Sequence, residues 1–280
     1  SENTATGSLA LQFNVSGSEN TGTGYKALYF NTIGFGNTGL GAHALNHNVS
    51  GDQNTGVGRF ALYENITGDH NVAVGANALR FNTSGTLNVG VGFDALRANN
   101  QGEHNVAIGA DALASNTNAD RNTAAGFSAL HNNLGEDNTA TGANALHSNT
   151  FGNKNAAMGS SALRNNLTGT QNTATGYQAL YQNSSGHFNT ASGSEALYTN
   201  IDGDNNTAHG VQALFANVSG NENTGIGSAA LISNTFGSWN TACGVGSLYS
   251  NLSGNNNSAF GIRALHNNAE GFENTAVGKD

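Results

Sequence analysis

The sequence predicts an all-β repeat protein in which about sixteen short coils stack into a β-solenoid, or β-roll. The first observation is a seventeen-residue unit, Asn-Thr-Ala-x-Gly-x-x-Ala-Leu-x-x-Asn-x-x-Gly-x-x, that fills all 280 residues. The second is its register, which holds throughout except that the unit beginning at Asn122 lacks one residue before Gly135. A disordered chain has no reason to keep leucine at one phase of a period, so the register indicates a folded array although only 10% of the residues are charged.

The first five residues of each unit are predicted to form a short strand, in which side chains alternate between two faces. In the unit that begins at Asn71, residues Asn71, Ala73 and Gly75 would face one way. Val72 and Val74 would face the other way. Position three is always alanine or glycine, and small side chains repeated in phase indicate that backbone packs closely there.

The second half of the unit contains one large residue that never varies, the leucine at position nine, and Leu79 is the example in this unit. We expect it to point into the coil, on a segment that forms either a short helical turn or a bent second strand; seven residues are too few for a stable helix alone. Asn82 and Gly85, at positions twelve and fifteen, tolerate left-handed backbone geometry and are predicted corner residues. Stacked copies of Asn71 and Asn82 could form amide ladders, and the residue missing near Gly135 should cost one corner only.

Charge and length exclude several classes of partner. The net charge of −9, from 18 acidic and 9 basic residues, disfavours nucleic acid and anionic lipid because phosphate binding needs clustered cations. No stretch approaches the ~18 apolar residues of a membrane-spanning helix, and we expect no signal peptide within residues 1–280. Residues 1–280 are predicted to be one uninterrupted array from a longer fibrous protein, because both ends cut a unit. Cys243 is the only cysteine, so no disulfide framework exists.

Ordering seventeen residues per coil costs conformational entropy, and one chain buries little apolar surface to offset that cost. The constant inward residues of each unit are one leucine and a few small residues. Positions two and four carry aliphatic side chains in several units, such as Val89 and Val91. Left in water, they would form a long apolar stripe. We therefore expect a homo-oligomer, with this face buried between copies around a common axis. The alternative is a single-chain solenoid with the face folded inward.

The Asn-Thr-Ala-Val-Gly pentad, intact from Asn274 to Gly278, with Ala-Leu and an Asn-x-x-Gly corner, resembles the head repeats of trimeric autotransporter adhesins and related repeats of trimeric bacteriophage tail fibres. The resemblance covers the whole chain at the level of a short degenerate repeat. The adhesin unit is shorter, with an Asn-Ser-x-Ala-x-Gly pattern, and lacks the constant Ala-Leu pair. The resemblance implies a homotrimeric, left-handed β-roll that is used for attachment, and it supplies no catalytic residues.

Two sets of side chains recur at one position and are candidate contacts. Aromatic rings at position ten could stack on sugars, bind protein or pack between chains. Acidic residues at position sixteen would align about 5 Å apart as a stripe that favours a divalent cation or a basic partner; alternatively, Gly-Asp and Gly-Glu simply form solvated turns. The position-ten residues are Tyr29, Tyr63, Tyr181, Tyr198, Phe215 and Tyr249. The position-sixteen residues are Asp52, Asp69, Glu103, Asp120 and Glu136.

Metal and catalytic sites find no support in the pattern. His131 and His147 share position ten in adjacent units, but no third ligand occurs at a fitting phase. We expect no metal and no other cofactor. An enzyme is equally disfavoured, because no acid, base or nucleophile occurs in one unique, non-repeating constellation.

The sequence therefore favours a structural fibre or adhesin segment, a stiff rod exposed on a cell surface or virion. Many weak repeated contacts with a host-surface or glycan receptor would give it avidity. A glycan-binding module that uses the position-ten aromatics is one alternative. Ice binding by threonine pairs at positions two and four is another. Those pairs are Thr4/Thr6, Thr21/Thr23, Thr139/Thr141 and Thr173/Thr175.

Overall fold

The computed structural model describes residues 2–279 and divides into two compact units, Ser1–Asp137 (unit 1) and Asn138–Asp280 (unit 2). Every strand has three residues and begins at position two of a repeat. Unit 1 contains β1 (Thr4–Thr6), β2 (Thr21–Thr23), β3 (Thr38–Leu40), β4 (Thr55–Val57), β5 (Val72–Val74), β6 (Val89–Val91), β7 (Val106–Ile108) and β8 (Thr123–Ala125). Unit 2 contains β9 (Thr139–Thr141), β10 (Ala156–Met158), β11 (Thr173–Thr175), β12 (Thr190–Ser192), β13 (Thr207–His209), β14 (Thr224–Ile226), β15 (Thr241–Cys243), β16 (Ser258–Phe260) and β17 (Thr275–Val277).

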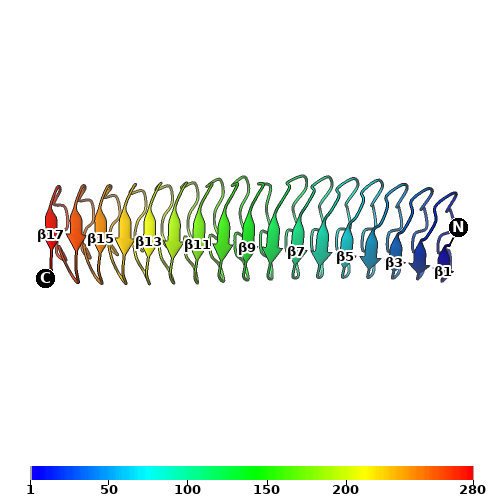
Figure 1. The fold of residues 1–280 in the computed structure, drawn as a ribbon, viewed down its shortest axis with the longest axis horizontal. Coiled ribbons are helices and arrows are strands. Elements are labelled where there is room, and N and C mark those ends of the chain that lie inside the picture. The colour runs from blue at the N-terminus through cyan, green and yellow to red at the C-terminus, as the bar shows by residue number, and fades with distance from the viewer. Residues whose placement is uncertain (1, 280) are drawn as a thin grey trace. The chain divides into compact units, whose positions relative to one another are not determined.

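Within each unit, every strand pairs in parallel with the strand of the next repeat, as Figure 1 shows. The pairing is in register: Val72 lies opposite Val89, and Val89 opposite Val106. One repeat is thus one coil, and each coil rests on the coil before it. The predicted all-β solenoid is confirmed. The described residues contain no helix, and so none that could cross a membrane.

The two faces of each strand differ as predicted. Position three points inward, and Ala73 has no exposed surface, while Val74 beside it is 37% exposed. Asn71 and Leu79 are also fully buried, so each coil encloses its own core of leucine, alanine and asparagine. The alternative in which positions two and four fold inward is wrong, because the buried space within a coil is already filled by positions one, three, eight, nine and twelve.

Amide ladders run through this core, as predicted. The Nδ2 of Asn82 donates to the Oδ1 of Asn65 in the preceding coil at 2.7 Å and to the carbonyl oxygen of Gly85 at 2.9 Å. In the next coil, Asn99 donates in turn to the Oδ1 of Asn82 at 2.8 Å. All of these asparagines are fully buried, and buried amides are tolerated only when their donors and acceptors are paired.

A second ladder runs along position one. The backbone N–H of Asn71 donates to the Oδ1 of Asn54 at 2.9 Å, and the Nδ2 of Asn71 donates to the Gly85 carbonyl oxygen at 2.8 Å. The N–H of Asn88 repeats the pattern by donating to the Oδ1 of Asn71 at 3.0 Å. Gly85 therefore accepts from both ladders, which ties the start of a coil to its last corner.

The helical turn considered for the Ala-Leu segment does not form. In the coil around Leu79, the backbone φ is +135° at Gly75, +59° at Asn77 and +50° at Leu79. A right-handed helix needs consecutive residues near −60°, so this alternation excludes it. The segment is instead a series of tight turns, in which the N–H of Ala78 donates to the Gly75 carbonyl and the N–H of Leu79 donates to Ala95 in the next coil.

The corner residues were correctly placed, but the reason given for them was wrong. Asn82 and Gly85 are absent from the positive-φ positions, which are five, seven, nine and seventeen of the repeat. Asn82 is needed for its amide ladder. Gly85 is needed because a Cβ there would overlap the carbonyl oxygen of Gly102 in the next coil. Close contact between coils, rather than left-handed geometry, selects glycine at position fifteen.

The shortened coil changes one corner, as predicted. The usual corner is seen at Asn116, whose Nδ2 donates three residues ahead to Ala119 at 3.0 Å. In the shortened coil, Asn133 donates only two residues ahead, to Gly135 at 2.7 Å. The coil beneath carries alanine at position fifteen, where other coils have glycine. Because a Cβ at this position points at the next coil's corner, we infer that the shorter corner makes room for the Ala119 methyl group.

Position seven provides a test of backbone strain. Ser161 has a φ of +58°, a region that costs a residue with a Cβ about 1–2 kcal/mol. We expect Ser161→Gly to stabilise unit 2 by about 0.5–1 kcal/mol after the entropy of glycine is subtracted. The neighbouring Ser160 lacks a positive φ, so Ser160→Gly should destabilise by a similar amount. Urea unfolding followed by circular dichroism measures both, and equal effects of the two changes would contradict the assignment of strain.

Candidate interaction surfaces

The position-ten aromatics of unit 2 stack on one another. The ring centroids of Tyr181 and Tyr198 lie 5.1 Å apart with planes at 2°, and those of Tyr198 and Phe215 lie 5.2 Å apart at 8°. Arg164 closes one end of the stack, with Nη1 donating to the Tyr181 hydroxyl at 2.9 Å. Burial, with Tyr181 and Glu195 nearby, raises the pKa of Tyr198. Rings whose faces cover each other offer mainly their edges to a partner.

The remaining position-ten residues lie in different surroundings. Tyr249 stacks on His266, with centroids 4.8 Å apart, and both line a shallow open depression with Val245 and Arg263. Tyr29 and Tyr63 belong to unit 1 and are separated by the coil that carries Asn46 at position ten. Of the six predicted residues, Tyr181, Tyr198 and Phe215 therefore form one stack, and Tyr29, Tyr63 and Tyr249 lie outside it.

Sequence reasoning missed a larger aromatic and cationic cluster in unit 1. Phe13, Phe30 and His47 stack along position eleven, with centroids 5.4 and 5.1 Å apart. Tyr29 and Tyr63 contact this column edge-on, with centroids 4.9 Å from Phe13 and 4.8 Å from His47. The signal in the sequence is that rings occur at both position ten and position eleven in successive coils; the prediction used position ten only.

Phe60 joins this cluster by contacting Tyr63 edge-on, with centroids 5.3 Å apart, and three cations lie over rings of the cluster. The Nζ of Lys26 is 5.1 Å from the centroid of Tyr29. The guanidinium carbons of Arg59 and Arg80 are 4.6 and 4.8 Å from that of Phe60, distances at which a cation is attracted to the ring face. Burial lowers the pKa of His43, and Lys26, Arg59 and His47 lower it further. This edge of unit 1 therefore carries positive charge on a chain whose net charge is −9.

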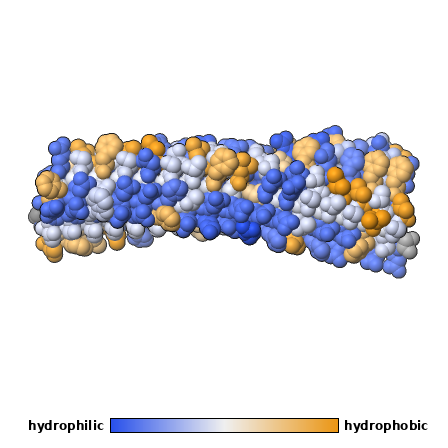
Figure 2. All heavy atoms as spheres, turned by 90° about the horizontal axis from the view of Figure 1, so that it is seen from above, coloured by the Kyte–Doolittle hydropathy of each residue, from blue (hydrophilic) through white to orange (hydrophobic). Residues whose placement is uncertain are grey.

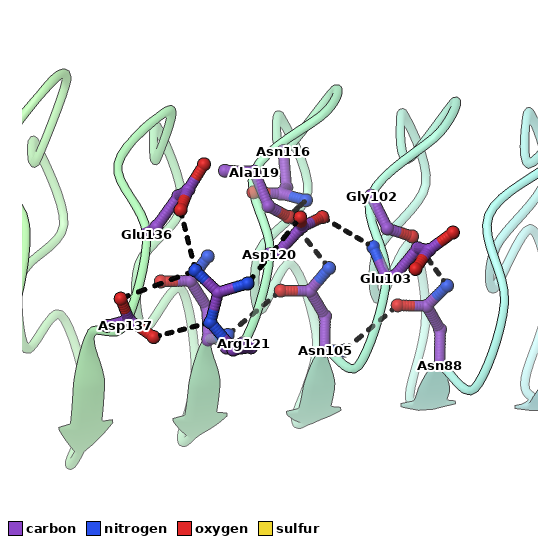
Figure 3. Close-up of polar contacts among 11 residues, drawn as sticks. Asn88, Gly102, Glu103, Asn105, Asn116, Ala119, Asp120, Arg121, Glu136 and Asp137 are labelled. Atoms are coloured by element: carbon purple, nitrogen blue, oxygen red, sulfur yellow. Dashed lines mark hydrogen bonds and ion pairs between the residues drawn. The ribbon is translucent and has the colours of Figure 1, made fainter.

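The aspartates at position sixteen serve as backbone acceptors. The Oδ1 of Asp69 accepts the N–H of Asp52 at 2.7 Å. The Oδ1 of Asp120 accepts the N–H of Glu103 at 2.8 Å, as Figure 3 shows. Asp52 in turn accepts the N–H of Phe35 at 2.9 Å. A carboxylate at this position therefore links its coil to the preceding one. This supports a structural role for the stripe.

Arg121 lies among the carboxylates at the far end of the stripe (Figure 3). Its Nη2 is 2.7 Å from Glu136, its Nε is 2.7 Å from Asp137, and its Nη1 is 3.8 Å from Asp120. The hydrogen bond to Asp137 and the charge of that carboxylate raise the pKa of Arg121. No group of three metal-ligating side chains that could hold an ion occurs within residues 2–279, and His131 and His147 belong to different units.

The outward strand face differs between the units. In unit 1, position four is aliphatic from β3 to β7, and its exposed members include Leu40 at 38% and Ile108 at 50%. In unit 2, position two is threonine from β11 to β15. The threonine pairs are adjacent only in β1 and β2, since β10 separates β9 from β11. No broad flat face of threonine pairs results within either unit, so the geometry does not favour ice binding.

The face drawn in Figure 2 is mixed in character. On the face drawn in Figure 2, hydrophobic side chains are interspersed with hydrophilic ones. A comparison with protein-family models finds none that matches this chain, and a comparison with curated proteins finds no matching protein. Any functional conclusion must therefore rest on the surfaces described above.

Proposed function

We propose that this chain is a segment of a structural fibre or adhesin, non-enzymatic and without a cofactor, that forms a stiff rod outside a cell or on a virion. Three copies associate around a common axis, with the coils wound left-handed as the resemblance to adhesin heads implies. The rod attaches to cells or surfaces through repeated weak contacts with a host-surface or glycan receptor. Neither nucleic acid nor direct insertion into a membrane is part of this function.

The observation that carries the proposal is the aliphatic strand face of β3 to β7. Leu40, Val74 and Ile108 are 37–50% exposed in a single chain, and they lie in one column because the strands pair in register. A parallel ladder of similar aliphatic side chains is well suited to pack against the same ladder in other copies. Burial of this face between chains would remove the longest apolar column of unit 1 from water.

The single cysteine provides a direct test. Cys243 lies at position four of β15 and is partly exposed, so in the proposed trimer three copies meet near the axis. We expect a short bismaleimide to join two chains through Cys243 and to leave the third unlinked. Adding Ser192→Cys, at position four of β12, gives each chain two cysteines. The cross-linked product should then contain three chains and never four.

Two controls make this test decisive. In a Cys243→Ser background, Ser84→Cys places the thiol on a different, exposed edge of the coil and should give no cross-link. Light scattering should give three times the chain mass of 28.5 kDa. A light-scattering mass of one chain at micromolar concentration would contradict the trimer. If the chain with both cysteines gave cross-linked products of two chains at most, the assembly would be a dimer instead.

A further inference from the structure

The side chains at position six of unit 1 alternate strictly between large and small. This position follows the turn glycine and lies at the outer edge of the coil. We call its large members the position-six row. They are Tyr25, Arg59, Phe93 and Phe127. The coils before and between them carry Ser8, Ala42, Ala76 and Ala110.

The rings of the row are well exposed. Tyr25 is 47% accessible, Phe93 54% and Phe127 56%. Tyr25 meets His43 edge-on, with centroids 5.2 Å apart, whereas Phe93 and Phe127 contact no other ring among the described residues of unit 1. The small position-six residues of the adjacent coils therefore leave the ring surfaces of Tyr25, Phe93 and Phe127 open.

Coil spacing does not force this alternation. Tyr181, Tyr198 and Phe215 occupy one position in three successive coils and stack without conflict. At position six itself, Val245 and Ile262 follow each other in adjacent coils of unit 2. The gaps in the row are thus a property of its sequence rather than a packing requirement.

The period of the row suits one kind of ligand. Two coils at ~4.8 Å each give ~9.6 Å between successive members. An extended β-1,4-linked polysaccharide turns each sugar over relative to the last, so the same sugar face recurs at every second residue over nearly this distance. Exposed aromatic rings bind such apolar sugar faces while the polar edges stay in water.

The positive charge beside the first half of the row, around Tyr25 and Arg59, indicates that the polysaccharide is acidic. Arg59 is a member of the row, and Lys26 and Arg80 lie on the adjoining cluster. No carboxylate of the described residues lies within ion-pair distance of these three cations; the pairs that do form involve Arg97 and Arg121. The buried Nε of Arg80 also has no hydrogen-bond partner. Carboxylate groups on the sugars would complement this charge.

We propose that the position-six row of unit 1 binds an extended β-1,4-linked polysaccharide that carries carboxylate groups. Of four successive two-sugar repeats, Tyr25, Phe93 and Phe127 lie under the first, third and fourth, and Arg59 pairs with a carboxylate of the second. This deepens the attachment function proposed above by giving its receptor a chemical class. It does not depend on the number of chains, so cross-linking through Cys243 can succeed whether or not the sugar binds.

Calorimetric titration with a β-1,4-linked mannuronate decamer tests the proposal. We expect the full chain to bind it, and Phe93→Ala combined with Phe127→Ala to weaken binding by about 10- to 100-fold. The matched control, Ile66→Ala with Leu87→Ala, removes two aliphatic side chains of similar exposure from other edges of unit 1 and should leave binding unchanged. Circular dichroism confirms that each variant is folded.

A second variant separates spacing from general hydrophobicity. Phe93→Ala with Ala110→Phe keeps the number of rings but places two of them in adjacent coils, and we expect it to bind as weakly as the double alanine variant. Arg59→Gln should weaken mannuronate binding about tenfold and leave cello-oligosaccharide binding unaffected. Absence of mannuronate binding at millimolar concentration, or full binding by the ring-shifted variant, would overturn the proposal. If Arg59→Gln left mannuronate binding unchanged, or weakened the binding of both oligosaccharides by the same factor, the acidic part of the proposal would be overturned.

Discussion

Gly58→Ala is expected to destabilise unit 1 by about 3–5 kcal/mol. Gly58 has a φ of +126°, a region that L side chains rarely adopt and that costs about 1–3 kcal/mol. A Cβ there would lie 2.7 Å from the carbonyl oxygen of Gly75 in the next coil. Neither atom can move without breaking the strand pairing above it, so the overlap adds to the strain. Equilibrium unfolding in urea measures the loss.

The same coil offers its own control. Gly56 lies two residues earlier at position three, where a Cβ would meet the Ala61 carbonyl oxygen at 3.2 Å and the Leu45 side chain at 3.3 Å. Other coils place alanine at this position, such as Ala73. We expect Gly56→Ala to change stability by less than about 1 kcal/mol, since reduced freedom of the unfolded chain offsets the tighter contact. A similar loss from both changes would show that the contact between coils is not what selects Gly58.

The second large effect is expected at the buried amide ladder. Asn82→Ala removes two donated hydrogen bonds and one accepted bond, and it leaves the amide groups of Asn65 and Asn99 short of a partner in a dry core. Unpaired buried polar groups cost about 1–3 kcal/mol each, so we expect a loss of about 2–4 kcal/mol. Hydrogen–deuterium exchange should also quicken in the coils that contain Asn65 and Asn99.

Asn118 provides the matched control for this change. It is exposed at position fourteen, so Asn118→Ala should change stability by less than about 0.5 kcal/mol. If Asn82→Ala were as mild as Asn118→Ala, the asparagine ladder would contribute little, and the constancy of position twelve would need another explanation.

Periodicity allowed the solenoid to be predicted, because a fixed repeat forces equivalent residues into equivalent environments. The inward set of Ala73, Leu79 and the asparagine ladders followed from that argument, and the structure confirms it. The path of the chain between strands did not follow. Leu79 has a φ of +50°, which no propensity rule assigns to leucine; its side chain fills the core and its N–H donates to the next coil, and these contacts together maintain the strained backbone.

The surfaces were harder to predict than the core. The acidic stripe could be predicted from the sequence. The hydrogen bond from the Asp52 N–H to Asp69 could not, because it depends on the backbone conformation at the corner of the coil, which periodicity does not determine. The aromatic cluster of unit 1 combines rings from several positions of the repeat, so the pattern at any single position does not reveal it. The large side chains of the position-six row can be read from the sequence, but the sequence does not show that Phe93 and Phe127 are more than half exposed.

The hydrogen bonds of each coil pass only to the coil before and the coil after, so each unit behaves as a one-dimensional lattice with nearest-neighbour coupling. Changes at distant coils should then combine additively, whereas changes in adjacent coils should not. Unfolding one interior coil breaks its contacts with two neighbouring coils, whereas unfolding a terminal coil breaks its contacts with one. The cooperativity of unfolding therefore depends on the strength of each contact between adjacent coils, and the coil shortened at Gly135 makes a contact that differs from the others.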